Sequence, residues 1–259
     1  MIIKDVKFSY NESKYGLGPY IEFFSELEVP SLEYGDIVKA IKNSNPDYKD
    51  IKVMSYIENV VSSTKDTLKL GKNDKIFFTA NTHWGQQNII RYLQRPFNDI
   101  KEMDETLIAN WNNIVGKDDI IFHLGNFAKG GIVKWNKILE RLNGKKYLIT
   151  SYHDMKTIGK GQIRLEHVAM QMLINIGGQQ IYLNHSPLLF YGESKNTWQL
   201  YGNVHTNLHH TGTNRSIIDN LLPTQYDVGV DNNNFTPVSY EQICAKIQQQ
   251  IITQKEQRA

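Results

Sequence analysis

Histidine and asparagine side chains recur at the ends of short apolar runs in this sequence. Imidazole nitrogens and amide oxygens can bind divalent metal ions, and the same groups also serve as ordinary hydrogen-bonding groups in a buried pocket. The segments that carry them are Asn81-Thr82-His83, Gly125-Asn126-Phe127, Tyr152-His153-Asp154, His185 and Gly202-Asn203-Val204-His205. Their chemistry depends on whether the fold brings them together.

The elements that would position these segments are strands alternating with helices from residue 75 onward. Apolar runs predict strands over 75–80, 119–124, 146–150 and 199–201, and a hairpin over 168–176 and 180–184 that turns at Gly177-Gly178. Helical spacing of apolar residues predicts helices over 100–115 and 132–142. Loops at strand ends commonly assemble sites from distant parts of a chain, so we expect the segments to meet.

Residues 1–71 form an extension that precedes this pattern. Ile3, Val6 and Phe8 fall among polar residues roughly as in a strand, and 20–24 is ambiguous between a strand and a buried turn. Residues 36–42 and 51–70 are expected to be helical, which makes the extension mostly helical. We place the main domain at 72–247 and a polar tail, a solvated or frayed helix, at 248–259.

Composition limits the classes of function. The net charge is +2, which does not indicate nucleic acid as a partner. A single cysteine, Cys244, excludes an internal disulfide. The first residues lack the apolar centre of a signal peptide, and no apolar run approaches the ~20 residues that span a bilayer. We therefore expect a protein of the cytoplasm or of a phage particle, with no membrane partner.

The order, spacing and flanks of the five segments resemble the calcineurin-like metallophosphoesterase family, in its small bacterial and phage branch. The likeness covers roughly residues 75–246. It includes Thr79 to Ile90, Leu142 to Ile149, Trp198 to His205 and Asp227 to Asp231. The family pattern reads D-x-H, G-D, G-N-H-D, H and G-H-x-H. The resemblance implies an α/β (α+β) fold of the αββα type, with two stacked sheets and helices outside.

The resemblance also implies a set of metal-ligand positions. One ion would have Asn81, His83, Asn126 and His205, and its partner would have Asn126, Tyr152, His185 and Asn203. His153 and Asp154 match the pair that assists the leaving group. Four ligand positions depart from the family pattern, because Asn81 and Asn126 replace carboxylates, Tyr152 replaces an amide and Asn203 replaces a histidine. Carboxylates in such a site both ligate the metals and offset the repulsion between two cations.

These departures predict a degenerate metallophosphoesterase that acts as a structural or binding module, in the setting of a phage virion or its assembly. His153 and Asp154 are then vestigial, no cofactor is expected, and residues 1–70 attach to protein partners or to further copies. The alternative is an enzyme: a residual single-metal phosphodiesterase or phosphatase that uses His83, His205 and His153 with one Mn, Zn or Ni ion. A third interpretation is a metal-free binder of a phosphate or nucleotide.

Overall fold

The computed structural model describes residues 2–12, 20–29, 34–58, 68–71, 74–158, 163–189, 191, 197–205 and 221–258. The chain divides into two compact units, Met1–Ser63 and Thr64–Ala259. Each unit has its own hydrophobic core. None of the helices in these ranges combines the length and apolar character that crossing a membrane requires.

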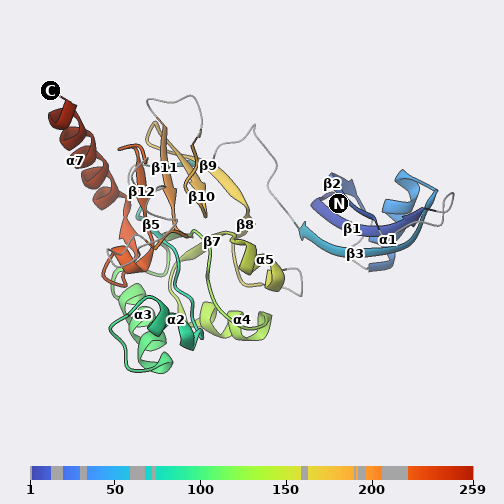
Figure 1. The fold of residues 1–259 in the computed structure, drawn as a ribbon, viewed down its shortest axis with the longest axis horizontal. Helices are drawn as coiled ribbons and strands as arrows, with labels where there is room; N and C mark the ends of the chain where they lie inside the picture. Colours follow the sequence, from blue (N-terminus) through green and yellow to red (C-terminus); the bar gives the residue numbers. More distant parts are fainter. Residues whose placement is uncertain are drawn as a thin grey trace. The chain divides into compact units, whose positions relative to one another are not determined.

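The first unit is a three-stranded antiparallel sheet with one helix (Figure 1). Its elements are β1 (Ile2–Glu12), β2 (Tyr20–Glu28), α1 (Tyr34–Ser44) and β3 (Tyr48–Glu58), and the strand order is β2-β1-β3. Val6 and Phe8 of β1 pack with Ile37 and Ile41 of α1 in a small core. The sheet shows irregular pairing between β1 and β3, where the register shifts three times.

The prediction of a mostly helical extension is wrong. Strand β3 occupies the first part of the segment 51–70 that we expected to be a helix. Val53 and Ile57 fit a helical stripe, but together with Ile51 they also follow the period-2 spacing of a strand, and β-branched side chains favour the pleated arrangement. The end of the same segment is β4 (Leu68–Leu70), which pairs with β9 and so belongs to the second unit. Residues 59–67 lie outside the described residues.

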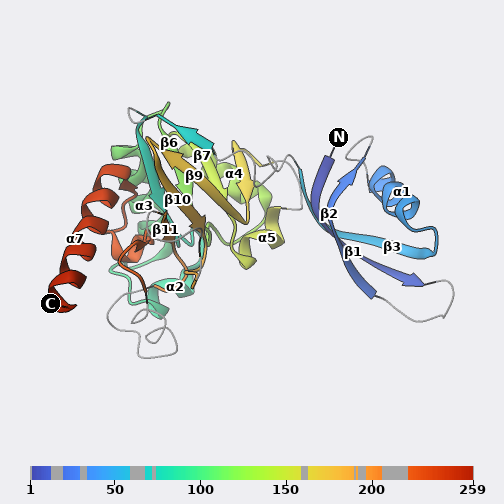
Figure 2. The ribbon, with the colours of Figure 1, turned by 90° about the horizontal axis from the view of Figure 1, so that it is seen from above.

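The second unit is a mixed α/β structure built on two five-stranded sheets. One sheet has the order β13-β5-β6-β7-β8, and the other has the order β12-β11-β10-β9-β4, in which β9, β10 and β11 lie side by side (Figure 2). The strands of the first sheet are β5 (Ile76–Thr79), β6 (Ile120–His123), β7 (Lys145–Ile149), β8 (His167–Ala169) and β13 (Val238–Ser239). Those of the second are β4, β9 (Gln171–Ile176), β10 (Gln179–Asn184), β11 (Thr197–Tyr201) and β12 (Gln225–Asp227).

Alternating side chains place the sheet of β5 between two cores. Ile76 and Phe78 join one core with Ile174 and Leu183 of the other sheet, so the two sheets stack face to face. Phe77 faces the opposite core. There it packs with the helices α2 (Gln87–Tyr92), α3 (Ile100–Ile114) and α4 (Ile132–Arg141), which cover this face of the sheet (Figure 1).

The last helix, α7 (Tyr240–Arg258), contacts β5, β12 and β13 and inserts Ile243 and Ile247 into the core between the sheets. It continues through residues 248–258, part of the polar tail that we expected to be a solvated or frayed helix. The remaining elements are the helix α5 (Tyr152–Ile158) and the 3₁₀ turn Val230–Asn232.

Most strands and helices predicted for the second unit are confirmed within one or two residues. One prediction is wrong in kind, because the run 168–176 is two strands and not one. The chain leaves the sheet of β7 after β8 and enters the other sheet as β9. Both strands are apolar and separated by one residue, Met170, so periodicity alone does not reveal the change of sheet.

Candidate functional site

Parallel strands bring the five predicted segments together. β5, β6 and β7 are parallel neighbours in one sheet, and β10 and β11 are parallel neighbours in the other. Their carboxyl ends lead into Asn81, Asn126, Asp154, His185 and Asn203. The amide N–H of Asn203 donates to Oδ1 of Asn81 at 3.1 Å, which joins the loops of the two sheets.

We call the side chains of Asn81, His83, Asn126, His185, Asn203 and His205 the imidazole–amide cluster. Five of its six members, all except His185, have positive φ angles between 44° and 67°. This left-handed conformation is uncommon for residues other than glycine and is often found where a loop must aim a side chain at a functional site. Backbone bonds between the loops hold it, such as His83 N–H to Asn126 O at 3.0 Å.

Two neutral amides face each other at the centre of the cluster. Nδ2 of Asn126 donates to Oδ1 of Asn81 at 3.4 Å, and both residues are buried. Nδ2 of Asn81 and Oδ1 of Asn126 are buried and have no partner. Asn203 is exposed and donates Nδ2 to the hydroxyl of Ser186 at 3.0 Å.

The three histidines each direct Nδ1 at an oxygen. The acceptors are Oε1 of Gln86 for His83 (3.1 Å), the carbonyl of Leu124 for His185 (2.6 Å) and Oδ2 of Asp231 for His205 (2.9 Å). An oxygen acceptor requires the proton on Nδ1, so Nε2 of a neutral ring carries the lone pair. Burial, with the neighbouring His205 and Arg95 charges, lowers the pKa of His83 to about 3, which keeps its ring neutral. Burial also lowers the pKa of His185.

Asp154, which the motif pairs with His153, accepts hydrogen bonds from backbone amides in the structure. Its buried carboxylate accepts the backbone N–H groups of Asn126 (2.8 Å), Phe127 (3.0 Å) and Ser151 (2.8 Å), together with the Ser151 hydroxyl. It therefore ties the loop after β6 to the start of α5. Oδ2 accepts three of these four hydrogen bonds and Oδ1 accepts one, so both oxygens of the carboxylate serve the loops.

Tyr152 and His153 are exposed at the first turn of α5. The Tyr152 ring lies edge-on to the His153 ring, with 5.9 Å between centroids, and the Lys156 ammonium lies 4.9 Å from the Tyr152 centroid. Tyr152 is 73% exposed. The described contacts of these two predicted site residues are with each other and with α5, and not with the cluster.

Two charged residues that the sequence did not single out hold the cluster. Arg95, completely buried, donates to both oxygens of Asp231 at 2.7 and 2.9 Å and to the carbonyls of Asn81 (2.6 Å) and Thr82 (3.1 Å). Burial alone would raise the pKa of Asp231, but the hydrogen bonds from His205 and Arg95 lower it to about 2. The sequence indicated only that both residues lie within the span 75–246 that carries the resemblance.

His123 is a buried histidine beside the cluster. The Thr82 hydroxyl donates to the carbonyl of Phe127 at 2.8 Å, so Nε2–H of His123 must be the donor in the 2.8 Å contact with that hydroxyl. Nδ1 is left without a partner. Burial, with smaller effects of His185 and His83, lowers the pKa of His123 to about 3.

The cluster does not fit the pair of divalent ions that the resemblance implies. The position that would bridge two ions holds Asn126, whose amide is paired with Asn81. The nearby carboxylates of Asp154 and Asp231 are already engaged by backbone amides, Arg95 and His205. Neither of these two carboxylates is therefore free to offset the repulsion between two cations.

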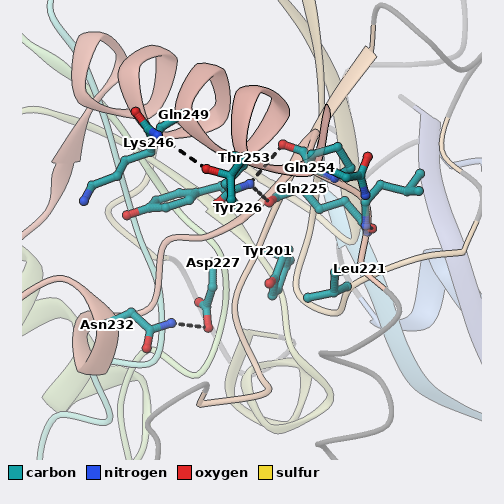
Figure 3. Close-up of a pocket in the computed structure, with 13 residues that line it drawn as sticks. Tyr201, Leu221, Gln225, Tyr226, Asp227, Asn232, Lys246, Gln249, Thr253 and Gln254 are labelled. Carbon is teal, nitrogen blue, oxygen red and sulfur yellow. Dashed lines mark hydrogen bonds between the residues drawn. The ribbon is translucent and has the colours of Figure 1, made fainter. Parts of the chain in front are cut away.

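A pocket of about 640 Å³ lies elsewhere, between α7 and the edge strand β12 (Figure 3). Its lining combines apolar surface, to which Leu221 and Leu222 contribute, with polar side chains that include Gln225, Asp227, Asn232, Lys246 and Gln254. Asn232 donates Nδ2 to Asp227 at 2.7 Å, and the Gln225 side chain bonds Gln199, so part of this polar lining is already paired. None of the cluster side chains lines it.

Fold and site together define an α/β protein of two stacked sheets, with a histidine- and asparagine-rich cluster at the strand ends. The chain is 33% identical over 176 residues to the uncharacterized protein MJ1445 of Methanocaldococcus jannaschii, covering 67% of this chain and 92% of the relative. It belongs to the same family as that archaeal protein.

Two further comparisons cover a similar share of the chain. The Gene 66 protein of Mycobacterium phage L5 is 27% identical over 179 residues, covering 60% of this chain and 86% of the phage protein. A crystal structure of AQ665, a protein of unknown function from Aquifex aeolicus, matches 67% of this chain and 99% of its own with a TM-score of 0.51 and 18% identity. This last likeness concerns the fold alone. No family model matches the chain.

Proposed function

We propose that this protein is a degenerate member of the metallophosphoesterase class that works as a binding or structural module without a two-metal hydrolytic centre. The observation that carries the proposal is the Asn126–Asn81 amide pair at the position where a shared carboxylate would be needed. A two-metal hydrolase uses both ions to clamp a phosphate and to generate hydroxide. A neutral amide offers one weak oxygen ligand and no compensating charge.

The setting that we propose is a phage particle or its assembly. It is supported by the relative in Mycobacterium phage L5 and by the separate first unit, which has its own core. The first unit is proposed as the attachment element, through which the chain joins a protein partner or further copies of itself.

The experiment is a hydrolysis assay of the full chain with bis-p-nitrophenyl phosphate and Mn, Ni or Zn. We expect no turnover above buffer. A matched variant with the four family ligands restored (Asn81→Asp, Asn126→Asp, Tyr152→Asn and Asn203→His) serves as the positive control for the assay and the fold. Metal-dependent turnover by the unaltered chain would contradict the proposal.

A residual single-metal phosphodiesterase is the second candidate. It is favoured by Nε2 of His83, a buried, unprotonated nitrogen without a partner. His153, the proposed proton donor in that case, is exposed. The same assay separates the two functions, because turnover of this kind has to disappear in a His153→Ala variant and in a His83→Ala variant.

A further inference from the structure

The pocket between α7 and β12 is a second place where this chain could hold a ligand, separate from the imidazole–amide cluster. Its volume of about 640 Å³ lies within the range of about 300–1,000 Å³ that is usual for sites of small organic molecules. Figure 3 shows side chains of α7 along one side of the pocket and Tyr201, Asp227 and Leu221 along the other. All the described lining residues belong to the second unit.

Helix α7 presents polar side chains to this pocket. Its apolar residues Ile243 and Ile247 enter the core between the two sheets. Residues three and four positions apart lie on the same side of a helix. The residues of α7 that line the pocket follow this spacing and carry amide, hydroxyl or ammonium groups; they are Lys246, Gln249, Gln250, Thr253 and Gln254. A stripe of this kind suits a polar ligand better than an apolar one.

The hydroxyl of Tyr201, in β11, makes no hydrogen bond within the described part of the chain. The residue lines the pocket and is only 3% exposed. Burial, with the neighbouring Asp227 and Tyr226, raises the pKa of Tyr201, so the hydroxyl keeps its proton and can both donate and accept. A buried polar group without a partner is unfavourable, and a bound molecule can supply the missing partner.

The charge that the pocket offers to a ligand is a single cation. Among the described lining residues, Asp227 is the one carboxylate, and it accepts the Gly229 N–H and Nδ2 of Asn232, both at 2.7 Å. Lys246 is exposed on α7, and the ion pairs of the described residues do not include it. One ammonium group suits a ligand with one negative charge better than a ligand with several phosphates.

The neutral groups match a molecule with several hydroxyls, because a hydroxyl and a primary amide each provide donors and acceptors. Nε2 of Gln250 donates to the carbonyls of Pro223 and Gln225, which leaves Oε1 as an acceptor. The Gln254 amide lines the pocket as well. The Tyr226 ring and the two leucines of the lining supply apolar surface for the C–H face of a sugar ring.

We propose that the pocket between α7 and β12 binds a saccharide unit that carries one carboxylate, of the uronic acid class. The carboxylate pairs with Lys246, and the ring hydroxyls bond the amides of α7 and the Tyr201 hydroxyl. This inference goes beyond the proposed function, because it concerns a different part of the second unit and does not depend on what the imidazole–amide cluster holds.

The test is saccharide binding by the full chain, measured by saturation-transfer NMR and calorimetry. The probes are D-glucuronate, D-glucose, which lacks the carboxylate, and adenosine monophosphate, an anion of another class. We expect glucuronate to bind about fivefold more tightly than glucose, which corresponds to one favourable charge contact. Adenosine monophosphate should bind more weakly than glucuronate.

Two variants and a matched control assign the site. Lys246→Gln should weaken glucuronate binding about fivefold and leave glucose binding unchanged. Tyr201→Phe removes only the hydroxyl and should weaken the binding of both saccharides about fivefold. Lys255→Gln, on the same helix but outside the pocket lining, should change neither. Circular dichroism and thermal melting establish that each variant folds.

Several outcomes would overturn the inference. Glucuronate that does not bind, or that binds no more tightly than glucose, would do so. Tighter binding of adenosine monophosphate would assign the pocket to nucleotides instead. Saccharide binding that neither Lys246→Gln nor Tyr201→Phe weakens would place the ligand elsewhere. Since none of these measurements involves hydrolysis or metal, each of these results leaves the proposed function standing.

Discussion

At the scale of the residue, the ion pair Arg95–Asp231 is the contact on which the cluster depends. The two side chains are 0% and 3% exposed, and Arg95 reaches the carbonyls of Asn81 and Thr82 as well. Removing one partner of such a pair leaves a buried charge without compensation. The pair therefore holds the loop of Asn81 and Thr82 in place in addition to the attraction between its two charges.

Asp231→Asn is expected to lower the free energy of unfolding by about 3–5 kcal/mol, because it leaves the Arg95 guanidinium buried and unpaired. Urea denaturation measures the change. The matched control is Glu105→Gln, which breaks the exposed pair between Glu105 and Arg141. That variant should differ from the unaltered protein by about 1 kcal/mol or less. Equal effects of the two substitutions would contradict this interpretation.

His123 predicts a pH dependence of stability. Its pKa is about 3 in the folded protein and about 6.5 when unfolded, so the unfolded chain binds the additional proton between these values. Stability is retained above pH 6.5 and decreases as the pH falls through this window. One such group contributes about 2 kcal/mol of loss between pH 7.5 and 5.

A His123→Phe variant, which keeps an aromatic ring beside Trp84 and Phe127, isolates that contribution. Its unfolding free energy should change by about 2 kcal/mol less than that of the unaltered protein over the same pH range. The constant loss of the Thr82 hydrogen bond does not affect this difference. Identical pH profiles would show that His123 is not the group responsible.

At the scale of the element, the loop after β6 depends on Gly125. Its φ is +84°, and a Cβ there would lie 2.5 Å from Nδ1 of His185 and 2.9 Å from the Ser151 amide nitrogen. The absence of a side chain lets the loops after β6, β7 and β10 approach one another closely. The packing of the site is thus set by a position without a functional group.

Gly125→Ala and Gly178→Ala form a matched pair of substitutions. Gly178, in the β9–β10 turn, has φ +101° but nothing within 4 Å of its Cβ position. Its substitution should cost only the backbone strain, about 1–2 kcal/mol. Gly125→Ala adds the steric conflict with His185, and we expect a further ~1–3 kcal/mol. If both variants lose the same free energy of unfolding in urea denaturation, the loops around Gly125 accommodate the added methyl group without cost.

At the scale of the whole molecule, the chain consists of two compact units with separate hydrophobic cores. The first has a small core of its own, and the second holds both larger cores. The archaeal relative and the Aquifex structure each match 67% of this chain while being almost fully covered themselves. Each match therefore leaves about a third of this chain uncovered.

A chain of residues 64–259 is therefore expected to fold alone, with a melting temperature within a few degrees of the main transition of the full chain. Calorimetry measures it. A chain that begins at residue 72 is the comparison, because it lacks β4, the edge strand that pairs with β9. It should be less stable. If the 64–259 chain does not fold, the division into two units is wrong as a description of stability.

The first unit is proposed as the element that attaches the chain to a partner or to further copies. Light scattering of the full chain and of the 64–259 chain compares their oligomeric states. Self-association that requires the first unit supports its role as an attachment element. If both chains are monomers, and the full chain recovers no partner from its native source, the proposed role fails.

Local sequence patterns predicted most elements of the second unit and the loops that carry the cluster. Apolar runs such as Ile76-Phe77-Phe78 are short and bounded, and side chains directly after them lie at strand ends in the folded chain. Such signals are local. Local signals were ambiguous in the first unit, where Val53 and Ile57 fit a helical stripe and, with Ile51, also fit strand alternation.

The burial and the hydrogen-bond partners of the site residues became known from the tertiary structure. Asp154 and His153 are adjacent in sequence, yet one is buried among backbone amides and the other is exposed. The partners of His205 and Asn81, namely Asp231, Arg95 and Asn126, lie between 14 and 45 positions away. Hydrogen bonding and burial depend on these distant contacts, so the amide pair and the orientation of each imidazole follow from how the loops of the two sheets pack together.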